Sequence, residues 1–175
     1  MEETKIMSPQ IKGLLIALVV IIFGIIGYYT GLGFSTTWYN WVVNLVLLAA
    51  IIFACVHFAN QKQNYVTFGN VFLHGFKITA VITIIILVYT LLAFNVLFPD
   101  MKEKIFEMQR TKMEESGMDD DKLEQATTMM KKYFMLFLIL GVIFGTLIWG
   151  CIASLIGAAV AKKRPINPLT QQGGM

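Results

Sequence analysis

The feature that most limits how this chain can fold is a set of four long apolar segments almost without charged side chains. They cover residues 13–29, 41–58, 78–98 and 133–161. A helix of about 17–25 apolar residues is long enough to cross a bilayer, and a helix satisfies its own backbone hydrogen bonds inside lipid. The sequence therefore predicts an all-α, polytopic membrane protein with four transmembrane helices and the lipid bilayer as a partner.

Charged residues concentrate in the loop between the third and fourth spans. Sixteen of the chain's 25 Asp, Glu, Lys and Arg residues lie within residues 99–132, and only 14% of the whole chain is charged, whereas a soluble domain carries about 25%. The basic balance of the chain comes from Lys and Arg that flank the spans. We therefore expect no nucleic-acid partner.

The loop 99–132 carries the sequence signals of two helices. Asp100 followed by Glu103 predicts a capping box at the start of the first helix, and Ser116-Gly117 predicts its end. We expect the second helix to continue into the fourth span without a break. Together these signals predict a charged helical hairpin outside the membrane, between spans three and four.

The distribution of Lys and Arg around the spans predicts the orientation in the membrane. If the N-terminus is cytoplasmic, that side holds Lys5, Lys12, Lys62, Lys77, Lys162, Lys163 and Arg164. The loop 99–132 has seven basic residues but nine acidic ones, whereas the short loops follow the rule. We expect both termini in the cytoplasm, a single membrane domain over residues 1–163, and a disordered cytoplasmic tail over residues 164–175.

An aromatic stripe precedes the third span. Phe68, Phe72 and Phe76 recur every four residues, and Thr67 can cap a helix there. This pattern is typical of a helix that lies at the membrane interface. It equally fits a simple N-terminal extension of the third span. Both interpretations of residues 67–77 remain open from the sequence.

The layout of the chain resembles a known family. The pattern consists of four spans, the segment YVTFGNVFLHGFK before span three, a charged helical stretch before span four, and a Gly/Ala-rich last span that ends in AKKR. It resembles the bacterial membrane family known as domain of unknown function 4199, over roughly residues 8–163. The resemblance implies a bacterial inner-membrane protein. It implies no catalytic or binding residues, because the family has no established activity.

Small residues recur through the fourth span, and small residues let two membrane helices approach closely. At 100° per residue they fall on two opposite faces. We expect the face nearer the cytoplasm to pack inside the bundle, against span two or span one, and the other face to be free for another span or for a second copy of the chain. The first face comprises Gly150, Ser154, Gly157 and Ala161, and the second comprises Gly141 and Gly145.

Three polar side chains, those of Asn44, Tyr89 and Asn95, lie within the spans. Ionisable groups at membrane depth mark sites of ion or proton transport, but the four predicted spans contain no Asp, Glu, Lys or Arg. We expect Asn44 and Asn95 near the outer edge of the hydrocarbon, where a hydrogen bond between them would join spans two and three.

The sequence shows no catalytic constellation. It has no nucleophile elbow, phosphate loop or zinc-protease motif. His57 and His74 lack the Cys or carboxylate cluster of a metal site, and we interpret Cys55 and Cys151 as small apolar fillers. We therefore expect no catalytic residue, no metal and no cofactor.

Three functions remain, and the favoured one is a structural or interaction protein that packs through its helices with itself or with a membrane partner. This function fits the small-residue faces and the lack of charge in the spans. A small transporter or channel, with Asn44, Tyr89 and Asn95 along its path, is the alternative. An enzyme ranks third because it would need polar residues that converge from distant parts of the chain.

Overall fold

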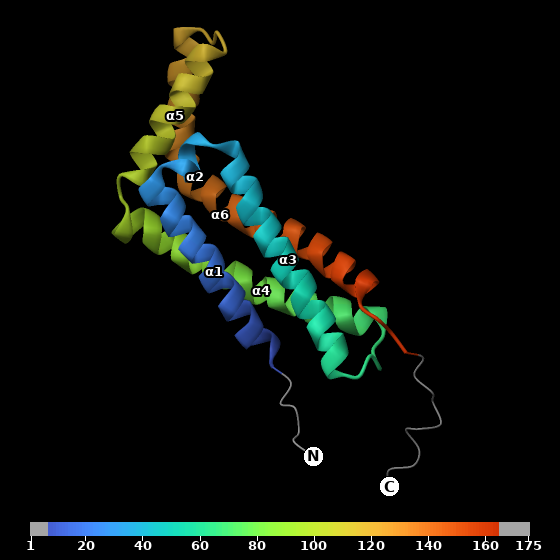
Figure 1. Ribbon diagram of the computed structural model, residues 1–175. Helices are drawn as coiled ribbons and strands as arrows, with labels where there is room; N and C mark the ends of the chain where they lie inside the picture. Colours follow the sequence, from blue (N-terminus) through green and yellow to red (C-terminus); the bar gives the residue numbers. More distant parts are fainter. Residues whose placement is uncertain (1–6, 165–175) are drawn as a thin grey trace. The chain divides into compact units, whose positions relative to one another are not determined.

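The computed structural model describes residues 7–164, apart from the side chains of residues 34 and 35, and this part of the chain is almost entirely helical (Figure 1). The helices are α1 (Pro9–Thr30), α2 (Leu32–Ser35), α3 (Thr37–Gln61), α4 (Phe68–Leu92), the π-helical turn η1 (Ala93–Leu97), α5 (Met101–Glu115) and α6 (Asp120–Val160). The predicted disordered tail lies outside the described residues from position 165 onward.

Four of these elements are long and apolar enough to cross a membrane. They are Pro9–Thr30, Thr37–Gln61, Phe68–Leu97 and Asp120–Val160. The prediction of an all-helical chain with four membrane-spanning helices is confirmed on length and composition. The continuous helix through the fourth span is confirmed as well, because α6 runs for 41 residues without a break.

The chain divides into two compact units, and each is described by itself. Unit 1 comprises residues 1–83 and 146–175, and unit 2 comprises residues 84–145. The described part of unit 1 holds α1, α2, α3, the first part of α4 and the last part of α6. Unit 2 holds the end of α4, η1, α5 and the first part of α6.

Helix ends in unit 1 follow from local chemistry. Ser8 caps α1 by accepting a hydrogen bond from the backbone N–H of Ile11, at 3.4 Å, and Pro9 fills the first position, where a missing N–H costs nothing. Gly31 ends α1 with φ of +72°, a left-handed conformation that glycine adopts without strain. The short helix α2 then links α1 to α3.

The aromatic stripe before span three belongs to one continuous helix. Thr67 Oγ1 accepts a hydrogen bond from the backbone N–H of Asn70 at 3.2 Å, as expected for a helix cap. From Phe68 onward, α4 runs unbroken to Leu92. Residues 68–77 therefore form an N-terminal extension of the helix of the third span. They do not form a separate helix.

Unit 1 is assembled through close helix approaches. A Cβ added at Gly13 of α1 would lie 2.8 Å from Val81 Cβ and 3.1 Å from the Ile78 carbonyl oxygen, both on α4. Tyr39 of α3 donates a hydrogen bond of 2.6 Å to the Phe23 carbonyl of α1. Small residues at such crossings let backbones approach, which is how membrane helices gain packing energy.

Within unit 2, α4 passes into the π-helical turn η1. Phe98 N–H donates to the Ala93 carbonyl at 2.8 Å, and Pro99 prevents the helix from continuing.

Asp100 stands at the cap position of α5, but its side chain makes no capping hydrogen bond. It has helical φ and ψ rather than the extended backbone of a normal cap, and its carboxylate pairs with Lys104 at 2.8 Å. The predicted capping box is therefore wrong.

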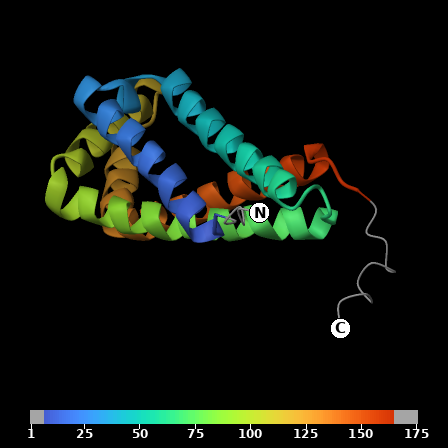
Figure 2. The same cartoon turned by 60° about the horizontal axis from the view of Figure 1, so that its bottom comes forward.

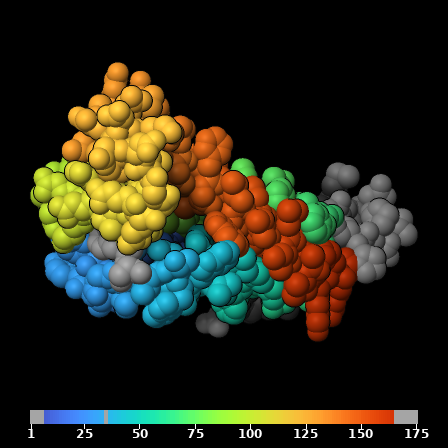
Figure 3. Space-filling view, turned by 90° about the horizontal axis from the view of Figure 1, so that it is seen from above, coloured from blue at the N-terminus to red at the C-terminus, as the bar shows by residue number. Residues whose placement is uncertain are grey.

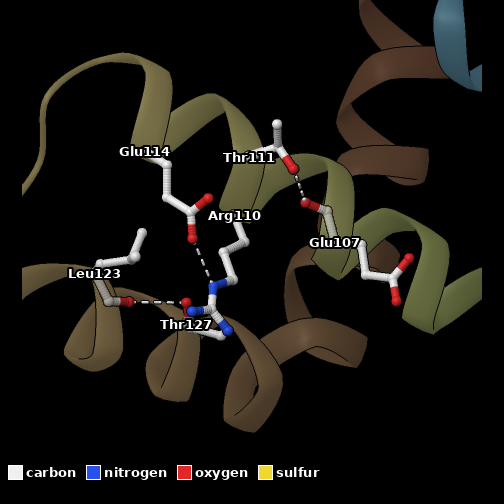
Figure 4. Close-up of polar contacts among 6 residues, drawn as sticks. All are labelled: Glu107, Arg110, Thr111, Glu114, Leu123 and Thr127. Carbon is white, nitrogen blue, oxygen red and sulfur yellow. Dashed lines mark hydrogen bonds and ion pairs between the residues drawn. The ribbon is translucent and has the colours of Figure 1, made fainter. Parts of the chain in front are cut away.

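Within unit 2, α5 lies against the first turns of α6 (Figure 3). The Phe106 ring packs edge-on against Phe134 with 5.0 Å between centroids. Arg110 pairs with Glu114 at 2.8 Å and points from α5 toward Thr127 of α6 (Figure 4). Gly117, with φ of +75°, forms the turn between the two helices.

Candidate functional site

A buried pair of polar side chains joins α1 to α4. Lys12 and His74 are each only 6% exposed, and Lys12 Nζ lies 3.3 Å from His74 Nε2. A lysine ammonium has only donors, so Nε2 accepts and the His74 proton is on Nδ1. Lys12 also donates to the Ala54 carbonyl of α3 at 3.4 Å. One ammonium therefore connects three membrane helices.

The Phe58 ring covers this pair. It stacks on His74 with 3.9 Å between the ring centroids and an interplanar angle of 9°, and Lys12 Nζ lies 5.9 Å from its centroid. Cation–π attraction compensates part of the hydration that the ammonium loses on burial. The stacking also fixes the plane of the imidazole.

A second layer of small polar groups lies one residue further along α4. A Cβ at Gly75 would lie 2.6 Å from both Cys55 Sγ and Ser154 Oγ. Cys55 and Ser154 are fully buried, and Ser154 donates to the Gly150 carbonyl at 2.7 Å within α6. Glycine at position 75 thus allows α3, α4 and α6 to meet.

A cleft of about 470 Å³ opens beside the Lys12–His74 pair. His74 and Lys77 of α4 line it together with Lys62 at the end of α3. The beginning of α1, at Ser8 and Pro9, forms another side. The cleft thus lies where one end of each of α1, α3 and α4 comes together.

The charge around this cleft is one-sided. The described residues of unit 1, positions 7–83 and 146–164, contain no Asp or Glu. They contain six basic residues: Lys12, Lys62, Lys77, Lys162, Lys163 and Arg164. Of these, Lys62 and Lys77 line the cleft and are exposed, so an anion that enters it would meet two ammonium groups.

The end of α6 brings more positive charge to the same part of unit 1. Arg164 N–H donates to the Asn64 carbonyl, just after α3, at 2.8 Å. Lys163 Nζ lies 5.6 Å from the centroid of the Phe68 ring, at the start of α4. Figures 1 and 2 both show the end of α6 beside the end of α3 and the start of α4.

One small-residue face of α6 is packed inside unit 1. A Cβ at Gly150 would overlap the Thr79 side chain of α4, and one at Gly157 would lie 2.7 Å from Cys55 Cβ and 3.3 Å from Ile52 Cα of α3. Ala161 is 3% exposed. These contacts come from spans two and three, whereas we expected span two or span one. Span one lies instead against α4, through Gly13.

The other small-residue face has a different environment. A Cβ built at Gly141 or Gly145 meets no atom of the described residues within 4 Å. Only 6% of the apolar stretch of α6 is buried, against 22–28% for the other three spans. The span with the most small residues is thus also the span whose apolar stretch is least buried.

Comparison with known proteins identifies the family. The model of the family described as "Protein of unknown function (DUF4199)" matches residues 12–163, which is most of the chain. The chain belongs to the DUF4199 family. No curated protein and no solved structure matches it.

In this DUF4199 chain the three polar residues predicted within the spans belong to different units, Asn44 to unit 1 and Tyr89 and Asn95 to unit 2. Asn95 donates to its own helix at the Leu91 carbonyl, at 2.8 Å, and accepts from Lys102 at 3.0 Å. Asn44 and Tyr89 are half-buried. A hydrogen bond between Asn44 and Asn95 stays a prediction.

Sequence reasoning did not find Lys12 in the core of the DUF4199 fold. The predicted first span begins at Gly13, because a lysine is a normal flank of a membrane helix. In the structure α1 begins at Pro9 and includes Lys12. The helix that contains the predicted first span therefore extends four residues before it and carries a buried lysine. A signal was present, because Gly13, beside Lys12, permits the close approach that buries it.

Proposed function

We propose that this protein is a multi-pass protein of a bacterial inner membrane that acts through helix packing, with a second copy of itself or with another membrane protein. The observation that carries the proposal is the contrast between the two faces of α6. Gly150 and Gly157 are packed against α4 and α3, whereas Gly141 and Gly145 have open space around them. Glycines that no described residue of their own unit contacts are suited to a helix from another chain.

The surface beside these glycines supports the same function. Five large apolar side chains of α6 are 39–65% exposed: Leu136, Phe137, Leu140, Phe144 and Ile148. In a bilayer such side chains contact lipid as readily as protein, so it is the glycines that favour a protein neighbour. Close backbone approach there would add van der Waals contact that lipid tails do not match.

The proposed arrangement in the membrane is N-in and C-in. In this arrangement α5 and the first turns of α6 form a charged hairpin outside the membrane, and the five exposed basic residues in the described part of unit 1 lie on the cytoplasmic side. The excess of Lys and Arg around the ends of the spans supports this orientation. The proposal assigns no catalysis, metal or cofactor to the chain.

Co-purification of two differently tagged copies tests the function. When one tagged copy is purified in a mild detergent, we expect the copy with the other tag, or a defined membrane protein, to co-purify with it. Replacement of both outer glycines (Gly141→Ile and Gly145→Ile) should reduce the yield of the neighbour at least tenfold. Gly69→Ile is the matched control, since a Cβ there meets only Thr67 Oγ1 at 3.9 Å. A wild-type chain that elutes alone, at the mass of a monomer, contradicts the proposal.

A small transporter is the second candidate function, and the buried Lys12–His74 pair favours it. Ionisable side chains inside membrane helices commonly line ion or substrate paths. Liposomes that contain the purified protein would then release a trapped anion faster than empty liposomes, and Lys12→Met would abolish the difference. Equal release from both kinds of liposome would eliminate this function.

A further inference from the structure

We propose that the cleft beside His74 binds the phosphate of an anionic phospholipid headgroup. The proposal goes beyond helix packing, because it assigns a ligand of defined chemistry to a site on unit 1. It rests on three observations about the described residues: the shape of the cleft, the hydrogen-bonding groups that line it, and the missing negative charge.

The cleft has both parts that a phospholipid needs. Lys62 and Lys77 supply ammonium groups, while Leu73 and Met7 supply apolar surface. It lies at the ends of three apolar helices long enough to cross a membrane. Basic pockets at the ends of membrane helices are typical sites for phosphate headgroups, and the apolar residues can contact the glycerol and the first carbons of the acyl chains.

His74 provides a directed hydrogen-bond donor. Lys12 occupies Nε2, so the proton is on Nδ1, and that nitrogen has no hydrogen-bond partner among residues 7–164. Only 6% of the surface of His74 is exposed, and the residue lines the cleft. A fixed N–H beside two lysines suits an oxyanion, since hydrogen bonds to charged acceptors are stronger than neutral ones.

The beginning of α1 adds a partial positive charge to the same cleft. Ser8 and Pro9 lie on its wall, and the positive end of the helix dipole favours anions there. Lys62 and Lys77 form no ion pair within the described residues. The described part of unit 1 has no acidic side chain to pair with them, so an anionic ligand would meet two ammonium groups without a described counter-charge.

Free phosphate shares this chemistry, but the lipid is favoured. The apolar part of the wall has no use in the binding of inorganic phosphate, and a lipid headgroup is present at this depth at high local concentration. The phosphate group itself would lie between Lys62, Lys77 and His74. Lys12 contacts Nε2 of His74 and so favours the tautomer whose proton is on Nδ1, the group assigned here as the donor to the phosphate.

Native mass spectrometry of the purified full chain tests the proposal. The protein in mild detergent is incubated with equal amounts of phosphatidylglycerol and phosphatidylcholine, and the bound lipid is identified by mass. We expect phosphatidylglycerol to be retained at least tenfold more than phosphatidylcholine. Each lysine near anionic lipid contributes about fivefold in affinity, so Lys62→Gln with Lys77→Gln should lower retention about 25-fold, and replacement of both by Arg should preserve it.

The matched control removes two charges elsewhere. Lys112→Gln with Lys122→Gln changes the net charge by the same amount in α5 and α6, and we expect retention within twofold of the wild type. Equal retention of the two lipids by the wild type, or an equal loss in both double variants, would overturn the proposal. Saturable binding of inorganic phosphate in equilibrium dialysis, without retention of phosphatidylglycerol, would overturn the assignment to a lipid.

Discussion

Lys12 Nζ lies 3.3 Å from His74 Nε2 in the buried part of unit 1. The two residues are 62 positions apart, so the contact fixes the beginning of α1 against α4. It also places a cation in the described part of unit 1, which holds no carboxylate. Packing and electrostatics of the cleft therefore depend on the same pair.

Removal of His74 should destabilise the protein more than removal of Lys12. His74→Leu leaves a buried ammonium without its ring acceptor, which costs about 1.5–3 kcal/mol. Lys12→Met removes the charge together with the cost of burying it and keeps most of the packing of the stem. In the double variant, most of the loss should disappear. Unfolding by detergent titration measures all three, and a His74→Leu variant as stable as Lys12→Met would contradict the pairing.

Addition of one methyl group at Gly75 should be harmful. The new Cβ would lie 2.6 Å from Cys55 Sγ and from Ser154 Oγ, and overpacking of this kind costs about 1–3 kcal/mol. Gly69→Ala is the control in the same helix, because its Cβ meets only Thr67 Oγ1 at 3.9 Å. We expect the control to keep the wild-type unfolding midpoint. If Gly75→Ala also keeps it, the close approach at Gly75 does not exist.

Labelling of single cysteines tests the orientation. A membrane-impermeant thiol reagent should modify Glu115→Cys in intact cells, because we expect α5 to lie outside. It should not modify Gln171→Cys, which belongs to the predicted cytoplasmic tail. Cys55 is buried and Cys151 half-buried, so the background is low. Modification of position 171 and protection of position 115 would reverse the orientation.

The helices themselves could be predicted because their signals are local. Apolar length fixes the four spans, and Ser116-Gly117 marks the end of α5 through the left-handed glycine at 117. The capping box at Asp100 could not be judged from residue spacing alone. The capping hydrogen bond is missing because Asp100, which follows η1 and Pro99, has helical backbone angles.

The candidate site could be predicted only in part, because it depends on contacts between distant residues. The angles of Gly150 and Gly157 around α6 follow from helix geometry, but their neighbours Thr79 and Cys55 do not. The same holds for Lys12. A lysine at this position suggests a residue that flanks the span and contacts water. Only the approach of α1 to α4 at Gly13 shows that the Lys12 side chain is buried.

Two glycine variants of α6 test most directly the claim that one face holds the bundle together and the other binds a neighbour. Gly157→Ile would force side-chain atoms into Cys55 and the α3 backbone, so we expect loss of folding. Gly145→Ile has open space around it, so we expect a wild-type unfolding midpoint and a smaller assembly by size-exclusion chromatography with light scattering. If both variants fold normally and elute at the wild-type size, the two faces do not have these roles.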